Sequence, residues 1–240
     1  MSSSKSRRIE LRPGEVIDTF LEGRLRLIQS VHGYRFSIDA IFLAEFVTIK
    51  PGDLVVDLGT GCGIMLLMLL AQKQVGTCIG LEIQQELASQ AARNASLNGF
   101  NKHMHVIAGD LRRCPIKEGK ADVVICNPPY RKAQSGRINP ELEKAIARHE
   151  LMATLDDILA TSSRLLKPKG RLAIVYPSER TVDLLTKMRR YQLEPKRVQI
   201  QYPSLGAPGK LLLVESSLGA RPGIKLLPPL MGQGNYSIPS

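Results

Sequence analysis

Residues 55–63, VVDLGTGCG, decide the fold, because an apolar run reaches an acid there and then glycines at alternate positions. Leu54, Val55 and Val56 are typical of a buried parallel strand, and residues 64–71 (IMLLMLLA) predict a packed helix directly after the turn. A strand that turns sharply into a helix exposes backbone N–H groups, and glycines let a ligand approach the chain closely. The stretch therefore predicts a site for a nucleoside cofactor.

The glycine spacing narrows the choice of cofactor. A dinucleotide site needs G-x-G-x-x-G, whereas this chain has G-x-G-x-G with Asp57 two residues before Gly59. An acid at the end of the strand repels a diphosphate but attracts a ligand that carries an ammonium and a sulfonium group. S-adenosylmethionine carries both groups and is the cofactor that the stretch favours. The alternative is a glycine-rich turn that binds nothing.

Two further acids follow predicted strands. Glu82 ends the strand predicted over residues 77–81, roughly twenty residues beyond the glycine turn, where doubly wound folds place a carboxylate that accepts both ribose hydroxyls. Asp110 follows the strand predicted over residues 103–107, and its carboxylate either accepts from an adenine amine or only forms a turn. Both acids are expected at the same edge of the sheet as Asp57.

A helix before the first core strand supplies another candidate acid. Ser37 is the expected N-cap of a helix over residues 40–48, which is amphipathic. One interpretation makes this segment a flap over the methionine end of the cofactor, with Asp39 facing the ammonium group. The other interpretation gives the segment only a capping and packing role.

The most specific motif is Asn127-Pro128-Pro129-Tyr130, which follows a strand predicted over residues 121–126. Prolines fix φ and lack an N–H, so the carbonyls of Asn127 and Pro128 stay rigid and available as acceptors. Two fixed acceptors hold an NH₂ group by both hydrogens and aim its lone pair at an electrophile. Tyr130 offers a face on which a planar substrate such as adenine can stack. A Pro-Pro turn that merely ends the strand is the alternative.

The charge of the chain suits a polyanionic partner. Its net charge is +11 and its pI is near 9.7, and each phosphate that a cation neutralises releases a counterion. A basic surface without such a partner is equally compatible with these values. Arg131, Lys132 and Arg137 follow the Asn-Pro-Pro-Tyr motif in a predicted loop, where they either hold substrate phosphates or are solvated.

The length and composition predict one α/β domain with short extensions. The chain has 240 residues, of which 43% are hydrophobic, and this is enough for one substantial core. We expect a partly flexible N-terminal extension over residues 1–30, the main domain over residues 31–217 and a tail over residues 218–240. Residues 167–170 are expected to end a helix before a strand over residues 171–175.

Metal binding and membrane insertion are not expected. His103 and His105 share a strand face but lack a third ligand nearby, so no metal site is predicted. The four cysteines show no C-x-x-C pairing, as in a reduced cytoplasmic protein. The longest apolar run has about eight residues, which is too few to span a membrane.

In the order and spacing of these motifs, the chain resembles the class I S-adenosylmethionine-dependent methyltransferases, and its Asn-Pro-Pro-Tyr motif marks their amino-methylating branch. Several stretches are also similar to the bacterial tRNA(Val) adenine-N6 methyltransferases. These stretches are GYRFSIDAIFLA, LEIQQELASQAARNASLNG, NPPYRK, AIARHEL, RLLKPKGRLAIVYPSER and LEPKRVQ. The resemblance implies a Rossmann-like fold with a seven-stranded, mostly parallel sheet in the order 3-2-1-4-5-7-6, strand 7 antiparallel, and helices on both faces.

The resemblance also implies an activity and a set of site residues. The activity is transfer of a methyl group from S-adenosylmethionine to the exocyclic amine of an adenine in tRNA, the adenine 3′ of the anticodon of tRNA(Val), with S-adenosylhomocysteine as product. The residues expected to bind the cofactor are Asp39, Asp57, Gly59, Gly61, Glu82, Ile83, Asp110, Leu111 and Asn127. Those expected at the target adenine and its RNA are Asn127, Pro128, Tyr130, Arg131, Lys132 and Arg137.

Two other functions stay open at this point. A carboxamide presents the same conjugated NH₂ group as adenine, so a protein glutamine N5-methyltransferase that acts on a release factor is the first alternative. An RNA-binding module that keeps the methyltransferase fold without activity is the second. We expect tRNA as the partner, a monomer or weak dimer, and a cytoplasmic location.

Overall fold

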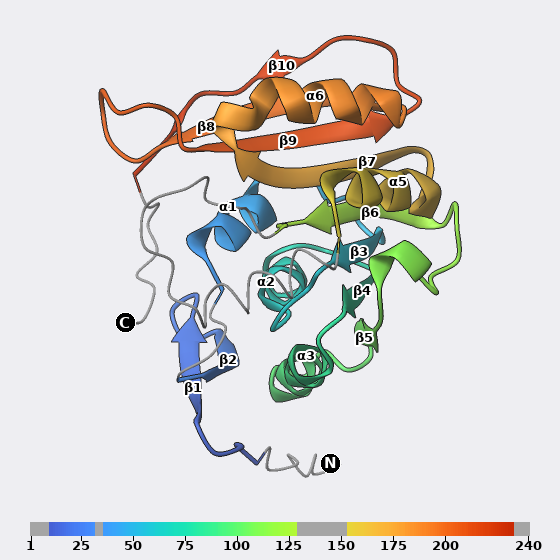
Figure 1. The fold of residues 1–240 in the computed structure, drawn as a ribbon. Coiled ribbons are helices and arrows are strands. Elements are labelled where there is room, and N and C mark those ends of the chain that lie inside the picture. Colours follow the sequence, from blue (N-terminus) through green and yellow to red (C-terminus); the bar gives the residue numbers. More distant parts are fainter. Residues whose placement is uncertain (1–9, 32–35, 129–152, 233–240) are drawn as a thin grey trace, which may run out of the picture.

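The computed structural model describes residues 10–31, 36–128 and 153–232, and a nine-stranded sheet flanked by helices is its main feature (Figure 1). The strands are β3 (Leu54–Leu58), β4 (Thr77–Glu82), β5 (Met104–Ala108), β6 (Ala121–Cys126), β7 (Leu166–Pro177), β8 (Leu193–Tyr202), β9 (Leu211–Leu218), β10 (Lys225–Leu226) and β11 (Leu230–Met231). The neighbours in the sheet follow the order β10-β8-β9-β7-β6-β3-β4-β5, and β11 also pairs with β8.

The strand directions agree with a doubly wound methyltransferase-like sheet. β3 is parallel to both β4 and β6, and β6 is parallel to β7. β9 is antiparallel to both of its neighbours, β7 and β8. The seven longer strands thus run β5-β4-β3-β6-β7-β9-β8, which is the order 3-2-1-4-5-7-6 that the resemblance implied.

The expected strand count of seven is too low, because part of the tail joins the sheet. β10 and β11 lie parallel to β8 and have two residues each. The N–H groups of Leu227 and Gly232 donate to the carbonyls of Val198 and Tyr202, both at 2.8 Å. The tail therefore covers a strand edge that would otherwise expose unpaired backbone groups.

Helices cover both faces of the sheet. One face holds α1 (Ile38–Phe46), α2 (Ile64–Gln72) and α3 (Gln85–Leu97), and the other holds α5 (Leu155–Leu165) and α6 (Thr181–Arg190). Side chains along a strand alternate between the faces. Val55 accordingly joins the core beneath α1 and α2, whereas Val56 joins the core beneath α5 and α6. Within the described ranges, no helix is both long and apolar enough to cross a membrane.

The chain between α5 and β7 differs from the prediction. The helix begins after Thr154, whose hydroxyl forms a capping box with Asp157, and it ends at Leu165. Residues 167–170, expected as the helix end, lie inside β7, where the pairing with β6 shifts register between Ala121 and Val123. Lys169 has a left-handed φ of 63° there, which allows the chain to bulge and stay in the sheet.

A hairpin from the N-terminal region packs against the domain. Its strands are β1 (Glu15–Phe20) and β2 (Leu25–Ser30), which pair antiparallel. The fully buried Asn94 of α3 fixes the hairpin, since its Oδ1 accepts from the N–H of Ile28 at 2.7 Å and its Nδ2 donates to the carbonyls of Ile28 and Cys62. Residues 15–30 are therefore an ordered layer, and the domain boundary near residue 31 stays a prediction.

Candidate active site

The glycine turn follows β3 in the conformation that its sequence predicts. Gly59, Gly61 and Gly63 have φ values of 79°, 56° and 87°, a region that residues with a Cβ atom rarely adopt. A Cβ atom at Gly63 would lie 2.6 Å from the terminal methyl group of Met104, which can move aside, and 3.2 Å from the Cβ of Ala91, so a larger residue would crowd α2 against α3. A Cβ atom at Gly59 would have no described atom within 4 Å. No described side chain therefore blocks the approach of a ligand to the first glycine.

Asp57 is a buried acid beneath this turn. Its Oδ2 accepts from the hydroxyl of Thr60 at 2.7 Å, and among the residues that the structure describes its buried Oδ1 has no hydrogen-bond partner. Burial raises the pKa of Asp57 to about 7, the hydrogen bond from Thr60 lowers it, and the nearby charge of Glu82 raises it further. A cation placed beside Asp57 would relieve this cost of burying a carboxylate.

Glu82 connects the end of β4 to the glycine turn. Its Oε2 accepts from the N–H of Gly61 at 2.9 Å, and its Oε1 accepts from the N–H of Gln84 at 3.0 Å. The side chain is buried, with 5% of its surface exposed. Each carboxylate oxygen can accept more than one hydrogen bond, so Glu82 holds the turn in place and can still accept from a ligand.

Asp110 has a local partner that the sequence analysis did not foresee. Its two carboxylate oxygens accept from the guanidinium of Arg112, the shortest contact being 2.6 Å, and its Oδ1 also accepts from the N–H of Arg112. The hydrogen bonds from the Arg112 side chain lower the pKa of Asp110. Arg112 therefore competes with any adenine amine for Asp110. Of the two apolar residues expected at the cofactor, Leu111 is half-buried, and Ile83, which directly follows β4, is 37% exposed.

Asn127 leaves the sheet next to the glycine turn. Ile125 pairs with Asp57 in the parallel register, and the thiol of Cys126 lies 3.2 Å from the carbonyl of Leu58. Asn127 is therefore beside Gly59, because each lies two residues beyond a paired position. Its side chain is half-buried, and the next residue, Pro128, is buried.

The start of α1 lies against the tip of β6. The Asn127 Nδ2 is 3.4 Å from the hydroxyl of Ser37. Ser37 occupies the N-cap position, as expected, but its side chain makes no capping hydrogen bond. Desolvation raises the pKa of Asp39 in the first turn of α1, and the charge of Lys210 opposes this shift. These contacts bring Asp39 and Asn127 to one side of the site.

The remaining predicted site residues lie outside the described part of the chain. They are Tyr130, Arg131, Lys132 and Arg137. Their expected roles in stacking and phosphate binding stay predictions.

Three contacts of the described site were not predicted from the sequence, namely those made by Thr60, Ser37 and Arg112. Only Thr60 had a usable signal, because a hydroxyl three residues after a buried acid in a tight turn can reach back to it.

Comparison with known proteins identifies the family. Residues 49–204 match the family model described as a methyltransferase domain. A protein from Parabacteroides distasonis named tRNA1(Val) (adenine(37)-N6)-methyltransferase is 31% identical over 180 residues, which cover 75% of this chain and 75% of that protein. The chain belongs to the tRNA1(Val) (adenine(37)-N6)-methyltransferase family. A Porphyromonas gingivalis protein of the same name is 28% identical over 189 residues, 75% of this chain and 73% of the relative.

Solved structures share the fold of this family member. A predicted O-methyltransferase from Agrobacterium tumefaciens has a TM-score of 0.66 at 20% identity, with 84% of this chain and 91% of that chain covered. A geranyl diphosphate C-methyltransferase from Streptomyces coelicolor, solved with Mg²⁺, geranyl diphosphate and S-adenosyl-L-homocysteine, has a TM-score of 0.55 at 15% identity, covering 74% and 78%. At these identities the likeness concerns the fold alone.

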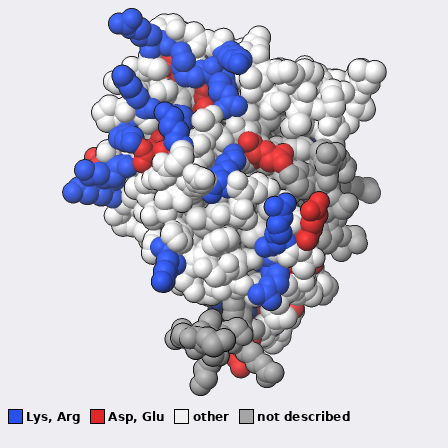
Figure 2. All heavy atoms as spheres, turned by 180° about the vertical axis from the view of Figure 1, so that it is seen from behind, with Lys and Arg blue, Asp and Glu red and all other residues white. Residues whose placement is uncertain are grey.

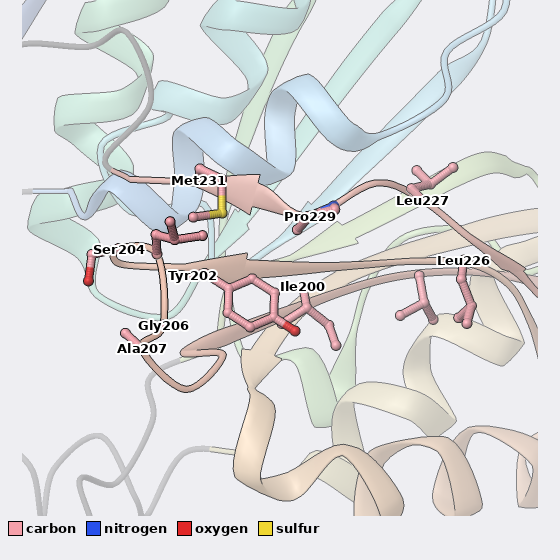
Figure 3. A pocket seen from close by; sticks show the side chains of 11 residues that line it. Ile200, Tyr202, Ser204, Gly206, Ala207, Leu226, Leu227, Pro229 and Met231 are labelled. Atoms are coloured by element: carbon pink, nitrogen blue, oxygen red, sulfur yellow. The ribbon is translucent and has the colours of Figure 1, made fainter.

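This member of the tRNA1(Val) methyltransferase family has a separate groove, which lies between β8 and the tail. It has a volume of about 460 Å³, and Ile200 and Tyr202 of β8 line it together with Leu226 and Met231 of the tail (Figure 3). No residue predicted for the active site lines this groove. Among the described residues, no group of three or more His, Cys, Asp or Glu side chains could hold a metal ion.

Proposed function

We propose that this chain transfers a methyl group from S-adenosylmethionine to the exocyclic N6 amine of an adenine in tRNA, adenine 37 being the position in the names of its relatives. The observation that carries the proposal is the position of Asn127-Pro128 beside the glycine turn and above the buried Asp57. An amine held at the tip of β6 would face a cofactor held at the tips of β3 and β4.

The described residues fit the cofactor. The buried Oδ1 of Asp57, which has no described partner, suits the positive charge of the methionine moiety. No described atom would lie within 4 Å of a Cβ at Gly59, and Glu82 keeps acceptor capacity for ribose hydroxyls. When bound, S-adenosylmethionine supplies a methyl group whose carbon–sulfur bond breaks as the nitrogen–carbon bond forms, and it leaves as S-adenosylhomocysteine. A reaction without metal stays a prediction.

Asn127 and Pro128 would position the amine. The side-chain oxygen of Asn127 and a main-chain carbonyl of the pair accept from both hydrogens of the NH₂ group, which favours a pyramidal nitrogen with a localised lone pair. No side chain has to remove a proton beforehand, since the nitrogen loses its proton to solvent once it carries the methyl group. Tyr130 is expected to stack on the adenine ring.

The test is methylation of a tRNA(Val) transcript made in vitro. The purified chain is incubated with methyl-labelled S-adenosylmethionine, and the RNA is digested to nucleosides for mass spectrometry. We expect N6-methyladenosine in the transcript and none in a transcript with guanine at position 37. Asn127→Ala should lower kcat on the order of a hundredfold to a thousandfold, while Asn101→Ala, an exposed amide away from the site, should leave kcat unchanged.

Three outcomes would count against the proposal. Equal kcat values for the wild type and Asn127→Ala would remove Asn127 from the mechanism. Label that stays on a protein band after nuclease treatment would favour the glutamine N5-methyltransferase. Failure of S-adenosylmethionine to bind in calorimetry would favour an inactive RNA-binding module. The cytoplasmic location and the monomeric or weakly dimeric state stay predictions.

A further inference from the structure

Basic side chains gather at the edge of the sheet opposite the candidate active site. Seen from behind, they concentrate toward the upper left of Figure 2, the side that lies at the right in Figure 1, where β8 begins and β9 ends. Six of these side chains form the amino-edge cluster, which is named for the amino ends of the parallel strands. Its members are Lys117, Lys120, Lys169, Arg190, Lys196 and Arg221.

Hydrogen bonds show that the segments carrying the cluster are adjacent. The N–H of Lys120 donates to the carbonyl of Leu165 at 3.0 Å, which places the start of β6 beside the start of β7. The hydroxyl of Ser217 donates to the carbonyl of Lys169 at 3.3 Å, which adds the end of β9. Glu194 pairs with Ser217, which adds the start of β8, and the Nζ of Lys196 donates to the carbonyl of Arg221 at 3.0 Å, which adds the start of the tail. Five segments therefore share one surface.

The acids on this surface already have partners. Glu118 pairs with Arg164 at 2.8 Å, Asp122 pairs with Lys167, and Glu194 pairs with Arg189 at 3.0 Å. Within the described ranges, no member of the amino-edge cluster forms a salt bridge with an acid, and all except the half-buried Lys196 are exposed. The net positive charge of this surface is therefore not cancelled locally, and it attracts polyanions.

We propose that the amino-edge cluster binds the sugar-phosphate backbone of the double-stranded part of the tRNA while the target adenine occupies the opposite edge. This inference rests on the proposed function, which supplies a folded RNA as the substrate. Twelve residues of β7 separate the two edges, about 40 Å for an extended strand, and a folded tRNA is longer than that. One tRNA can therefore contact both edges of the sheet by passing along one side of the domain.

The chemistry of the cluster favours phosphates over bases. Four of its six members are lysines, which act as point charges toward phosphates and do not provide the planar fork that reads guanine. Phosphate contacts position an RNA without reading its sequence, and each contact makes binding more dependent on salt. The cluster should thus strengthen the binding of whole tRNA and leave the choice of adenine to the active site.

The test compares two substrates and two variants. The substrates are the full-length tRNA transcript and a short stem-loop that contains the target adenine but cannot reach the amino edge. The first variant, K117Q/K120Q/K169Q, removes three exposed charges, and the second, K117R/K120R/K169R, keeps them. Arg24→Gln removes an exposed charge on the distant hairpin turn as a control for net charge.

We expect the glutamine variant to raise KM for full-length tRNA on the order of tenfold to a hundredfold at physiological salt, with kcat unchanged. The slope of log affinity against log salt for tRNA should fall by about three, one per lost phosphate contact. KM for the stem-loop should not change, and both the arginine variant and Arg24→Gln should behave like the wild type.

Two results would overturn the inference. One is an unchanged KM and salt slope for full-length tRNA in the glutamine variant. The other is an equal loss in the arginine variant, which would point to side-chain shape instead of charge. These results are distinct from failure of the proposed function, in which the wild type would methylate neither RNA.

Discussion

Replacement of Asp57 by Asn should change how stability depends on pH. The pKa of Asp57 is about 7 in the folded chain, against an ordinary value of 3.8. Between these values the folded chain holds a proton that the unfolded chain has lost, so the wild-type free energy of unfolding falls as pH rises and the loss is complete above pH 7. A tenfold change in proton affinity corresponds to about 1.4 kcal/mol, so the full cost is about 4 kcal/mol.

Asp57→Asn removes this titration and adds a smaller, constant cost. Its amide can keep the hydrogen bond from Thr60, but its NH₂ group would occupy the position of the Oδ1, which has no partner among the described residues, and a buried donor without an acceptor costs about 1–3 kcal/mol. The free energy of unfolding of the variant minus that of the wild type should therefore rise by about 3 kcal/mol between pH 5 and pH 8, nearly all of it below pH 7. Above pH 7 the variant should be the more stable protein.

The assay is urea unfolding followed by far-ultraviolet circular dichroism at pH 5, 6, 7 and 8, because the chain has no tryptophan. Glu86→Gln, which removes an exposed carboxylate, is the matched control for the loss of one negative charge. A constant difference for Asp57→Asn over the same range would refute the reasoning. If the proposed function holds, the variant should also bind S-adenosylmethionine about tenfold to a hundredfold more weakly, the usual effect of losing a charged hydrogen bond.

Three further substitutions test other parts of the structure. Asn94→Ala should lower the free energy of unfolding by about 2–4 kcal/mol, because it strands buried backbone groups, and should speed amide exchange in β2. Gly63→Ala should cost about 2–4 kcal/mol in urea unfolding, since its φ of 87° strains an alanine and its Cβ would lie 3.2 Å from that of Ala91, whereas Gly99→Ala, with a similar φ of 75° and no described atom within 4 Å, should cost only about 1 kcal/mol. Arg112→Ala should return the pKa of Asp110 toward its ordinary value by NMR titration, and an unchanged pKa would contradict the ion pair.

Much of the fold could be predicted because its central strands are covered on both faces. Such strands are continuous apolar runs bounded by polar turns, so β3 and β6 could be predicted from these runs alone. The family resemblance and the fold class are confirmed. The glycine turn was equally accessible, since φ values such as 79° at Gly59 leave few residue types that fit.

The parts that were missed depend on contacts without a side-chain pattern. β10 and β11 are held by backbone hydrogen bonds to β8, which almost any sequence can make. Residues 167–170 contain two lysines, a proline and a glycine, which are typical of a loop, and they stay in β7 because the partner strand shifts register. The pairing of Arg112 with Asp110 depends on a short 3₁₀ turn, Leu111–Arg113, that brings the two side chains together.

Asn94 also constrains the order in which this protein can be completed during synthesis. The hairpin leaves the ribosome before α3, because the amide that satisfies its Ile28 backbone groups lies 66 residues later in the chain. Until α3 has emerged, the backbone groups of Ile28 lack the amide that pairs with them. The same amide holds the carbonyl of Cys62 in the glycine turn, so the hairpin and the loop proposed to receive the cofactor both depend on a helix that is translated after them.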